Sequence, residues 1–400
     1  MYPYLICFLI TILLAYANEM HLRKHENSNK KSNASKVLLA ALVILPPAII
    51  AGLRAYVVGT DVMVYAYSTF NDAQNIHSIS DFFNPAGTVY NSPIEIGFWL
   101  LAWFSTLFGN DAHILLFFIS LFIGIFVYLI LYRMREFVSL WLGETVYLLC
   151  FYNETLNMMR QSMAVVMVMY AFTFVYYNRS WKKFLLIAIP SYFFHHSALI
   201  GLSLFIPVLM LGKENIGNKL SKKQMGRTII ISLLFAGVAA NFINIANMAN
   251  MAINVNDIFS DRYDHYIEDM TAENASSGIR ILIFYFVPYL LLYFRRKEIK
   301  FGYMFLCIAL IDAAFYYLRL RMPYLYRISS YYYWFKLLSL SALSIYPIKK
   351  KILSDKLYRL ILIVTLFLFW RLNYGGETFS QQMHGAHETM PYKSEILNIK

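Results

Sequence analysis

Arginines are the residues whose type and spacing most directly suggest chemistry in this sequence. Arg319, Arg321 and Arg327 lie close together beside the aromatic run YYYWF, and Arg160 opens the apolar stretch RQSMAVVMVMY. A guanidinium is planar, always charged and able to form paired hydrogen bonds with phosphate or carboxylate. These arginines predict an anionic ligand, with pairing to the acidic segment 257–273 or contact with lipid headgroups as the alternative.

Arg160 and Gln161 begin a predicted helix over 158–177. The positive end of the helix dipole lies beside the guanidinium, so an anion would be favoured there. The alternative is an internal ion pair between Arg160 and Glu154.

Two carboxylates stand near the starts of predicted apolar segments. Asp61 follows Arg54 in AGLRAYVVGTD, and Glu95 lies in NSPIEIGFW. An outward carboxylate could accept a hydroxyl proton or bind sugar hydroxyls. Asp61 could equally cap a helix, and the helix dipole alone could explain Glu95.

His195 and His196 are adjacent, so they point in different directions on a helix and do not form a metal-binding pair one turn apart. A histidine that titrates near neutrality can act as a general base or donate to a phosphate. His384 and His387 are three residues apart without further ligands, which is a weak signal. No metal site is predicted.

Composition indicates that a membrane protein must position these residues. The 400 residues are 59% hydrophobic and 14% charged, whereas roughly a quarter of the residues are charged in a soluble protein. The aromatic content of 18% suits interfacial belts and could also line a sugar-binding groove. The three cysteines lie in apolar segments, which argues against a disulfide framework.

Thirteen apolar segments are candidate spans or re-entrant helices. The first has no signal-peptide character and is expected to be retained. No soluble domain separates the segments, so we predict an all-α polytopic protein with a single membrane domain over 1–400. The segments are 2–18, 37–53, 94–108, 113–132, 138–152, 158–177, 184–195, 197–211, 228–246, 278–294, 301–317, 328–346 and 360–373.

Positive charge sets the expected orientation, because cytoplasmic loops retain lysine and arginine. Most basic residues lie in five loops, namely 19–36, 178–183, 213–227, 295–300 and 347–359. The segments expected to face outward are 54–92, 247–277, 318–327 and the tail 374–400. With both termini outside, the number of crossings is even, so either 94–108 or 138–152 is expected to be re-entrant. His195 and His196 are expected at the outer tip of a short hairpin.

Several nucleotide-binding signatures are missing from the sequence. It has no Walker-type loop, no GxGxxG fingerprint on a strand and helix, and no paired Asp motif of a nucleotide-sugar transferase. Cytosolic nucleotides are therefore not the expected substrates. The energy for any reaction should reside in an activated, membrane-bound donor.

A series of short motifs carries a family resemblance over residues 50–392. GLR and GTD are followed by EIGF, RQSMA, FHHSALI, an arginine–aromatic segment and MPY. Their order and spacing resemble the EpsG-like branch of the Wzy-type exopolysaccharide and O-antigen polymerases. The resemblance implies a GT-C-like polymerase or ligase architecture, with about 12 to 14 transmembrane or re-entrant helices.

The resemblance also implies an activity. A metal-independent glycosyltransferase without cofactors would act at the outer face of the bacterial cytoplasmic membrane. It would move a growing glycan from undecaprenyl diphosphate to a lipid-linked oligosaccharide repeat unit. Membrane lipids and a chain-length regulator are further expected partners, and nucleic acid is not. Alternatives are an O-antigen ligase, which should have a larger outer domain, and a flippase or transporter of the lipid-linked unit, which should show inverted repeats.

The resemblance carries over seven matched positions, which are Arg54, Asp61, Glu95, Arg160, Gln161, His195 and Arg327. Because a breaking glycosyl diphosphate bond leaves growing negative charge, we expect Arg160 and Arg327 to hold the diphosphate, together with Arg319, Arg321 or Arg54. His195 or Asp61 would deprotonate the acceptor hydroxyl. The remaining predicted substrate-binding residues are Glu95, Gln161 and His196.

Overall fold

The computed structural model describes residues 1–25, 33–178, 180–204, 206–207, 225–232, 234, 279–299, 301–319, 325–344, 352–375 and 386–400. Within these ranges the chain is helical, without strands, and its one β-bridge joins Ser394 and Ile399. The chain forms two compact units. The first comprises residues 1–195 and 336–400, and the second comprises 196–335.

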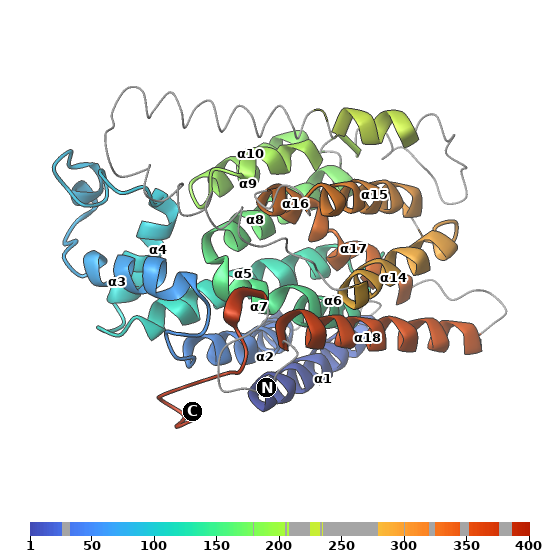
Figure 1. Cartoon of the computed structure of the whole chain (residues 1–400), viewed down its shortest axis with the longest axis horizontal. Coiled ribbons are helices and arrows are strands. Elements are labelled where there is room, and N and C mark those ends of the chain that lie inside the picture. Colours follow the sequence, from blue (N-terminus) through green and yellow to red (C-terminus); the bar gives the residue numbers. More distant parts are fainter. Residues whose placement is uncertain are drawn as a thin grey trace. The chain divides into compact units, whose positions relative to one another are not determined.

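Among the described residues of the first unit, four helices are long and apolar enough to cross a membrane. They match four of the predicted spans and confirm the helical membrane class, whereas the full number of crossings stays a prediction. α1 packs against α2, and α2 packs against α5 (Figure 1). The four helices are α1 (Tyr2–His25), α2 (Asn33–Gly52), α5 (His113–Arg133) and α18 (Ile352–Gly375).

The two doubtful segments differ in length. α4 (Ile96–Thr106) has 11 residues, about 16 Å at the α-helical rise, against the roughly 30 Å of a bilayer core. The other doubtful segment, 138–152, belongs to a longer helical stretch. This stretch consists of α6 (Leu140–Val146), the π-helical turn η3 (Tyr147–Phe151) and α7 (Tyr152–Asn157), which follow one another without a gap. Helix length therefore favours 94–108 as the re-entrant segment.

A break after α7 sets the start of the next helix. Met158 has φ −79° and ψ 53°, outside the helical region. α8 (Met159–Asn178) begins directly after it, packs against α5 and is followed by α9 (Trp181–Tyr192), which packs against α8. Arg160 and Gln161 therefore lie in the first turn of α8, as predicted.

The segment between α2 and α4 is folded rather than extended. It contains the π-helical turn η1 (Val62–Tyr67), α3 (Ser68–Ala73) and the 3-10 turn η2 (Ile79–Phe83). α3 packs on α4. This places the GTD motif, residues 59–61, directly before η1.

The second unit buries the aromatic run that could have lined a sugar-binding groove. Tyr331 and Tyr332 are both fully buried, and their hydroxyls hydrogen-bond to Ser197 and Ser203. Asp312 is also buried and accepts a hydrogen bond of 2.5 Å from the Tyr285 hydroxyl. These tyrosines therefore form core. Helices described in this unit include α10 (Ala198–Gly201), α14 (Ile279–Arg295), α15 (Gly302–Arg319) and α16 (Leu325–Tyr333).

Candidate functional site

Arg54 lies two residues beyond α2 and is buried, with 1% of its surface exposed. Its Nη1 donates to the carbonyl of Ala51 at 3.1 Å, and its Nη2 donates to the carbonyl of Leu156 at 2.8 Å. Leu156 lies in the last turn of α7, where carbonyl groups lack helical partners and the helix dipole favours a cation. Arg54 thus joins the end of α2 to the end of α7.

The GTD motif is fixed to the same end of α7. The Thr60 hydroxyl and the Asp61 backbone N–H both donate to Oδ1 of Asn157, at 3.1 and 2.7 Å. Gly59 has φ +97°, and a Cβ there would lie 3.0 Å from the carbonyl oxygen of Leu156. Both the positive φ and the lack of room for a Cβ therefore favour glycine at this position.

Asp61 occupies the N-cap position of η1, but its side chain makes no capping hydrogen bond there. The structure therefore does not show the Asp61 side chain capping a helix. Its role as a proton acceptor stays a prediction.

Arg160 pairs with Glu95, the N-cap residue of α4, through its Nη1. The guanidinium also lies over the ring of Tyr65, 4.3 Å from the ring centre. The side chain of Arg160 is 17% exposed and that of Glu95 is 6% exposed. The carboxylate that neutralises Arg160 is therefore Glu95 and not Glu154, and two predicted site residues are brought into contact.

The turn that carries His195 reaches the same end of α4. The N–H of Gly97 donates to the carbonyl of Phe193 at 2.8 Å, and a Cβ on Gly97 would come within 2.7 Å of that oxygen. Only glycine permits this approach, which explains the glycine of EIGF. His195 is half-buried in this turn.

These contacts bring most of the predicted site residues to one place in the first unit. Loop 54–61 is hydrogen-bonded to the end of α7, which is followed directly by α8. The start of α8 and the turn after α9 both contact the start of α4. Gln161 is 4% exposed beside Arg160. His196 is exposed and belongs to the second unit.

Three predicted arginines are not placed with this group. Arg319 ends α15 and Arg327 lies in α16, both in the second unit. Their side chains, Arg321 as a whole, and the predicted outer loop 247–277 lie outside the part of the chain that the structure describes. Their roles stay predictions.

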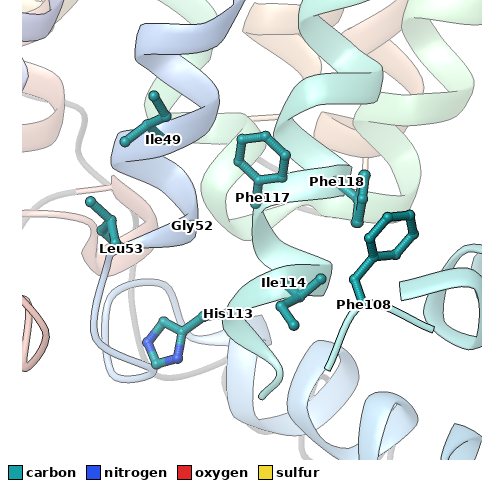
Figure 2. Close-up of a pocket in the computed structure, with 8 residues that line it drawn as sticks. All are labelled: Ile49, Gly52, Leu53, Phe108, His113, Ile114, Phe117 and Phe118. Carbon is teal, nitrogen blue, oxygen red and sulfur yellow. The ribbon is translucent and has the colours of Figure 1, made fainter. Parts of the chain in front are cut away.

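An apolar groove of about 390 Å³ lies where α2 ends and α5 begins (Figure 2). Both helices are candidate membrane spans. Leu53, on one wall of the groove, is next in the chain to the buried Arg54. The groove is lined by Ile49, Gly52, Leu53, Phe108, His113, Ile114, Phe117 and Phe118.

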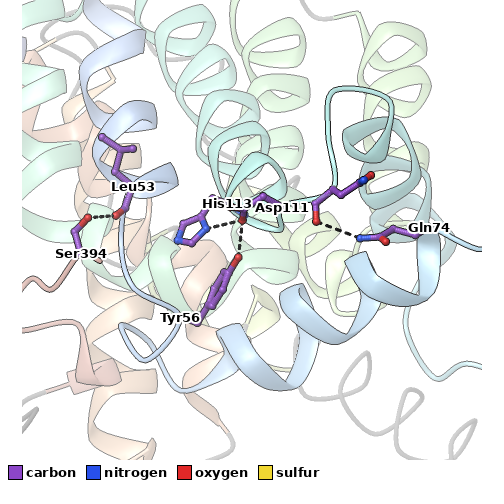
Figure 3. A network of polar contacts seen from close by, with 7 residues as sticks. Leu53, Tyr56, Gln74, Asp111, His113 and Ser394 are labelled. Carbon is purple, nitrogen blue, oxygen red and sulfur yellow. Dashed lines mark hydrogen bonds and ion pairs between the residues drawn. The ribbon is translucent and has the colours of Figure 1, made fainter. Parts of the chain in front are cut away.

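A polar cluster at the groove was not predicted from the sequence (Figure 3). The Tyr56 hydroxyl donates to Oδ1 of Asp111 at 2.7 Å, and Nδ1 of His113 lies 2.6 Å from the same oxygen. Burial and the hydrogen bond to Asp111 raise the pKa of Tyr56. Partial burial by itself would raise the pKa of Asp111. Hydrogen bonds from His113 and Tyr56 outweigh this effect and hold the pKa of this carboxyl below its usual range. Asp111 therefore stays ionised at neutral pH.

The C-terminal segment 386–400 was also missed as a part of the site. The carbonyl of Lys393 accepts from the N–H of Ala55 at 2.8 Å, and the Tyr392 hydroxyl donates to the carbonyl of Ile50 at 3.0 Å. Figure 3 shows the Ser394 hydroxyl donating to the carbonyl of Leu53 at 2.5 Å. The MPY motif thus holds the segment against the end of α2.

Asn153 in α7 connects two further parts of the first unit. Its Nδ2 donates to the Thr389 hydroxyl at 2.9 Å, and its Oδ1 accepts from the indole of Trp370 at 2.8 Å. The polar stretch NETLN between two apolar segments was the available signal for Asn153 and Asn157. In the residues that the structure describes, no three His, Cys, Asp or Glu side chains are grouped as metal ligands would be.

Apolar spans surrounding a charged site at helix ends define a multi-pass helical membrane protein. The EpsG family model matches residues 37–394, and the chain belongs to the EpsG family. It is therefore a membrane protein of the polysaccharide-polymerase type, with a glycosyltransferase-like activity. No curated protein and no solved structure matches the chain.

Proposed function

We propose that the protein extends a polysaccharide at the outer face of the bacterial cytoplasmic membrane. The growing glycan would leave undecaprenyl diphosphate and join a hydroxyl of a lipid-linked repeat unit. The observation that carries the proposal is the contact of Arg160 with Glu95 and Tyr65, beside a loop and a turn that bear Asp61 and His195.

Arg160 is the proposed diphosphate contact. Nη1 is used by Glu95, whereas the guanidinium has further N–H donors and is partly exposed. Glu95 cancels one positive charge, so the attraction for an anion must come from those donors and from the N-terminal end of α8. Glu95 also orients the guanidinium, which reduces the reorganisation needed when negative charge develops.

The bonds that form and break in the transfer determine what each residue of the site must do. The acceptor oxygen loses its proton and bonds to the anomeric carbon, while the bond from that carbon to the diphosphate breaks. The diphosphate leaves with the bonding electrons, so negative charge grows where Arg160 can stabilise it. His195 or Asp61 would take the acceptor proton.

The apolar groove beside Leu53 is the proposed seat for part of the isoprenoid chain. It opens at the ends of two candidate membrane spans, and its lining is almost wholly hydrocarbon. Arg54 is buried next to it and is proposed to fix the loop and α7, while Arg160 meets the ligand.

Purified protein with a synthetic undecaprenyl-diphosphate oligosaccharide tests the activity. A ladder of products without nucleotide or added metal supports a polymerase, and a single transfer to a different lipid acceptor would support a ligase. Movement of the lipid across vesicles without a covalent product would support a transporter. The Arg160→Lys variant, which we expect to form much less polymer, is assayed in parallel.

Labelling of intact cells tests the orientation. Thr60 is exposed, and the three native cysteines are buried, so a Thr60→Cys variant gives a specific thiol signal. A membrane-impermeant maleimide should label it from outside. Labelling only after the membrane is opened would place the site on the cytoplasmic side.

A further inference from the structure

His387 lies in a segment with an unusual backbone. His387 has φ +68° and Glu388 has φ +49°, both in the left-handed region that residues other than glycine seldom adopt. The carbonyl of Glu388 accepts from the N–H of Gly59 at 3.1 Å, and the carbonyl of Thr389 accepts from the Tyr4 hydroxyl at 2.8 Å. Such a conformation persists only where surrounding contacts maintain it, and these two contacts maintain it here.

The hydrogen bonds of Asn157 have a fixed direction. Its oxygen accepts from the backbone N–H of Asp61 at 2.7 Å, and a backbone N–H can only donate. The amide group of Asn157 must therefore turn its NH₂ toward His387, whose Nδ1 lies 3.2 Å from that nitrogen. Since an NH₂ group can only donate, Nδ1 of His387 must accept, and this requires the neutral ring with its proton on Nε2.

We propose that His387 is a positioning residue for the site, and that its protonation releases the loop bearing Thr60 and Asp61. A protonated ring carries a hydrogen on Nδ1, which would face the NH₂ of Asn157, so two donors would meet. Asn157 can relieve this only by turning its oxygen toward His387. The N–H of Asp61 and the Thr60 hydroxyl then lose their acceptor.

Other ionisable groups surround this contact. The Tyr374 ring of α18 lies 6.3 Å from the His387 ring, and its hydroxyl donates to the carbonyl of Cys150 at 2.8 Å. Glu388 is the next residue, Asp61 lies beyond Asn157, and Arg371 precedes Tyr374 by less than one turn of α18. The two carboxylates favour a protonated His387, and the arginine opposes it.

Hydrogen–deuterium exchange tests this without any substrate. Full-length protein in lipid nanodiscs would be compared at about pH 8 and about pH 5.5, a range that spans the ordinary imidazole pKa near 6.5. After correction for intrinsic exchange, peptides covering residues 54–61 should lose protection at the lower pH by up to about tenfold, as expected for one proton linked to the opening.

Three variants distinguish the proposal from a simple packing role. His387→Asn tolerates the left-handed backbone and offers a carbonyl acceptor that does not titrate, so protection should stay constant with pH. His387→Ala should lose protection at both pH values. In Asn157→Asp the carboxylate can accept both from the N–H of Asp61 and from a protonated His387, so residues 54–61 should keep their protection at low pH. The same acid-dependent loss in His387→Asn as in the native protein would overturn the proposal.

The inference concerns the proposed catalytic site, but the two ideas can fail separately. If the exchange results are as expected but neither the native protein nor any variant forms polymer at any pH, the proposed function fails while the role of His387 stands. If polymer forms but residues 54–61 lose the same protection with acid in the native protein and in His387→Asn, the role of His387 fails while the proposed function stands.

Discussion

Arg54 and Arg160 both lie near the break between α7 and α8, but their surroundings differ. Arg54 is buried and donates to two backbone carbonyls. Arg160 is partly exposed, pairs with a carboxylate and lies over an aromatic ring. The same side chain therefore serves two purposes, since Arg54 joins parts of the backbone and Arg160 presents a charge at the surface of the site.

Replacing Arg160 should have the largest effect on activity. Arg160→Lys keeps the charge but loses the planar set of donors. We expect polymer formation to fall about 100-fold, or about 2.7 kcal/mol at 1.36 kcal/mol per tenfold change, with single repeat units left in place of polymer. Product length is measured on gels. The thermal midpoint of the purified variant is measured alongside and should stay unchanged.

Arg135→Lys is the matched control for this change. Arg135 is exposed, donates to the carbonyl of Tyr132 at 3.0 Å and lies over the Tyr132 ring. It should retain full activity. Normal polymer from Arg160→Lys at an equal protein level would remove Arg160 from the site and abolish the contrast with Arg54.

Replacing Arg54 should act on stability first. Arg54→Met leaves the carbonyls of Ala51 and Leu156 without their donor, and hydrogen bonds to charged groups contribute about 1.5–3 kcal/mol each. We expect a lower thermal midpoint for the purified protein and a loss of activity that follows the loss of folded protein. A variant as stable as the native protein but inactive would instead give Arg54 a direct role in the reaction.

The contact of Tyr65 with Arg160 should give the smallest effect. A cation–π contact at a partly exposed site contributes about 0.5–1 kcal/mol, so Tyr65→Leu should lower the polymerisation rate about two- to fivefold. Tyr65→Phe keeps the ring and should keep the rate. Equal losses in both variants would indicate that the hydroxyl of Tyr65 matters and not its ring.

The sequence allowed the helical membrane class and most of the site group to be predicted, because both depend on local patterns. Apolar length identifies spans such as α2 and α5. In the folded chain Gly59 and Gly97 lie against the carbonyls of Leu156 and Phe193, a reason for these motif glycines that the sequence alone did not give. Arg160 and Glu95 were both predicted as site residues, but the sequence did not show that they form a pair.

Contacts over long sequence separations could not be predicted. Asn157 and His387 are 230 residues apart, and neither carries a motif that identifies the other. Tyr56 and Asp111 are ordinary residues of loops until the folded chain places them 2.7 Å apart. The apolar run that includes Tyr331 and Tyr332 was compatible with a ligand surface or a core, and only packing decided between the two.

The contact between segment 386–400 and the end of α7 has a consequence during synthesis. His387 leaves the ribosome 230 residues after Asn157, which takes roughly 10 to 50 seconds at 5–20 residues per second. Throughout that interval the first helices can enter the bilayer while Gly59 still lacks the carbonyl of Glu388. A nascent chain therefore cannot assemble its complete site until segment 386–400 has been synthesised.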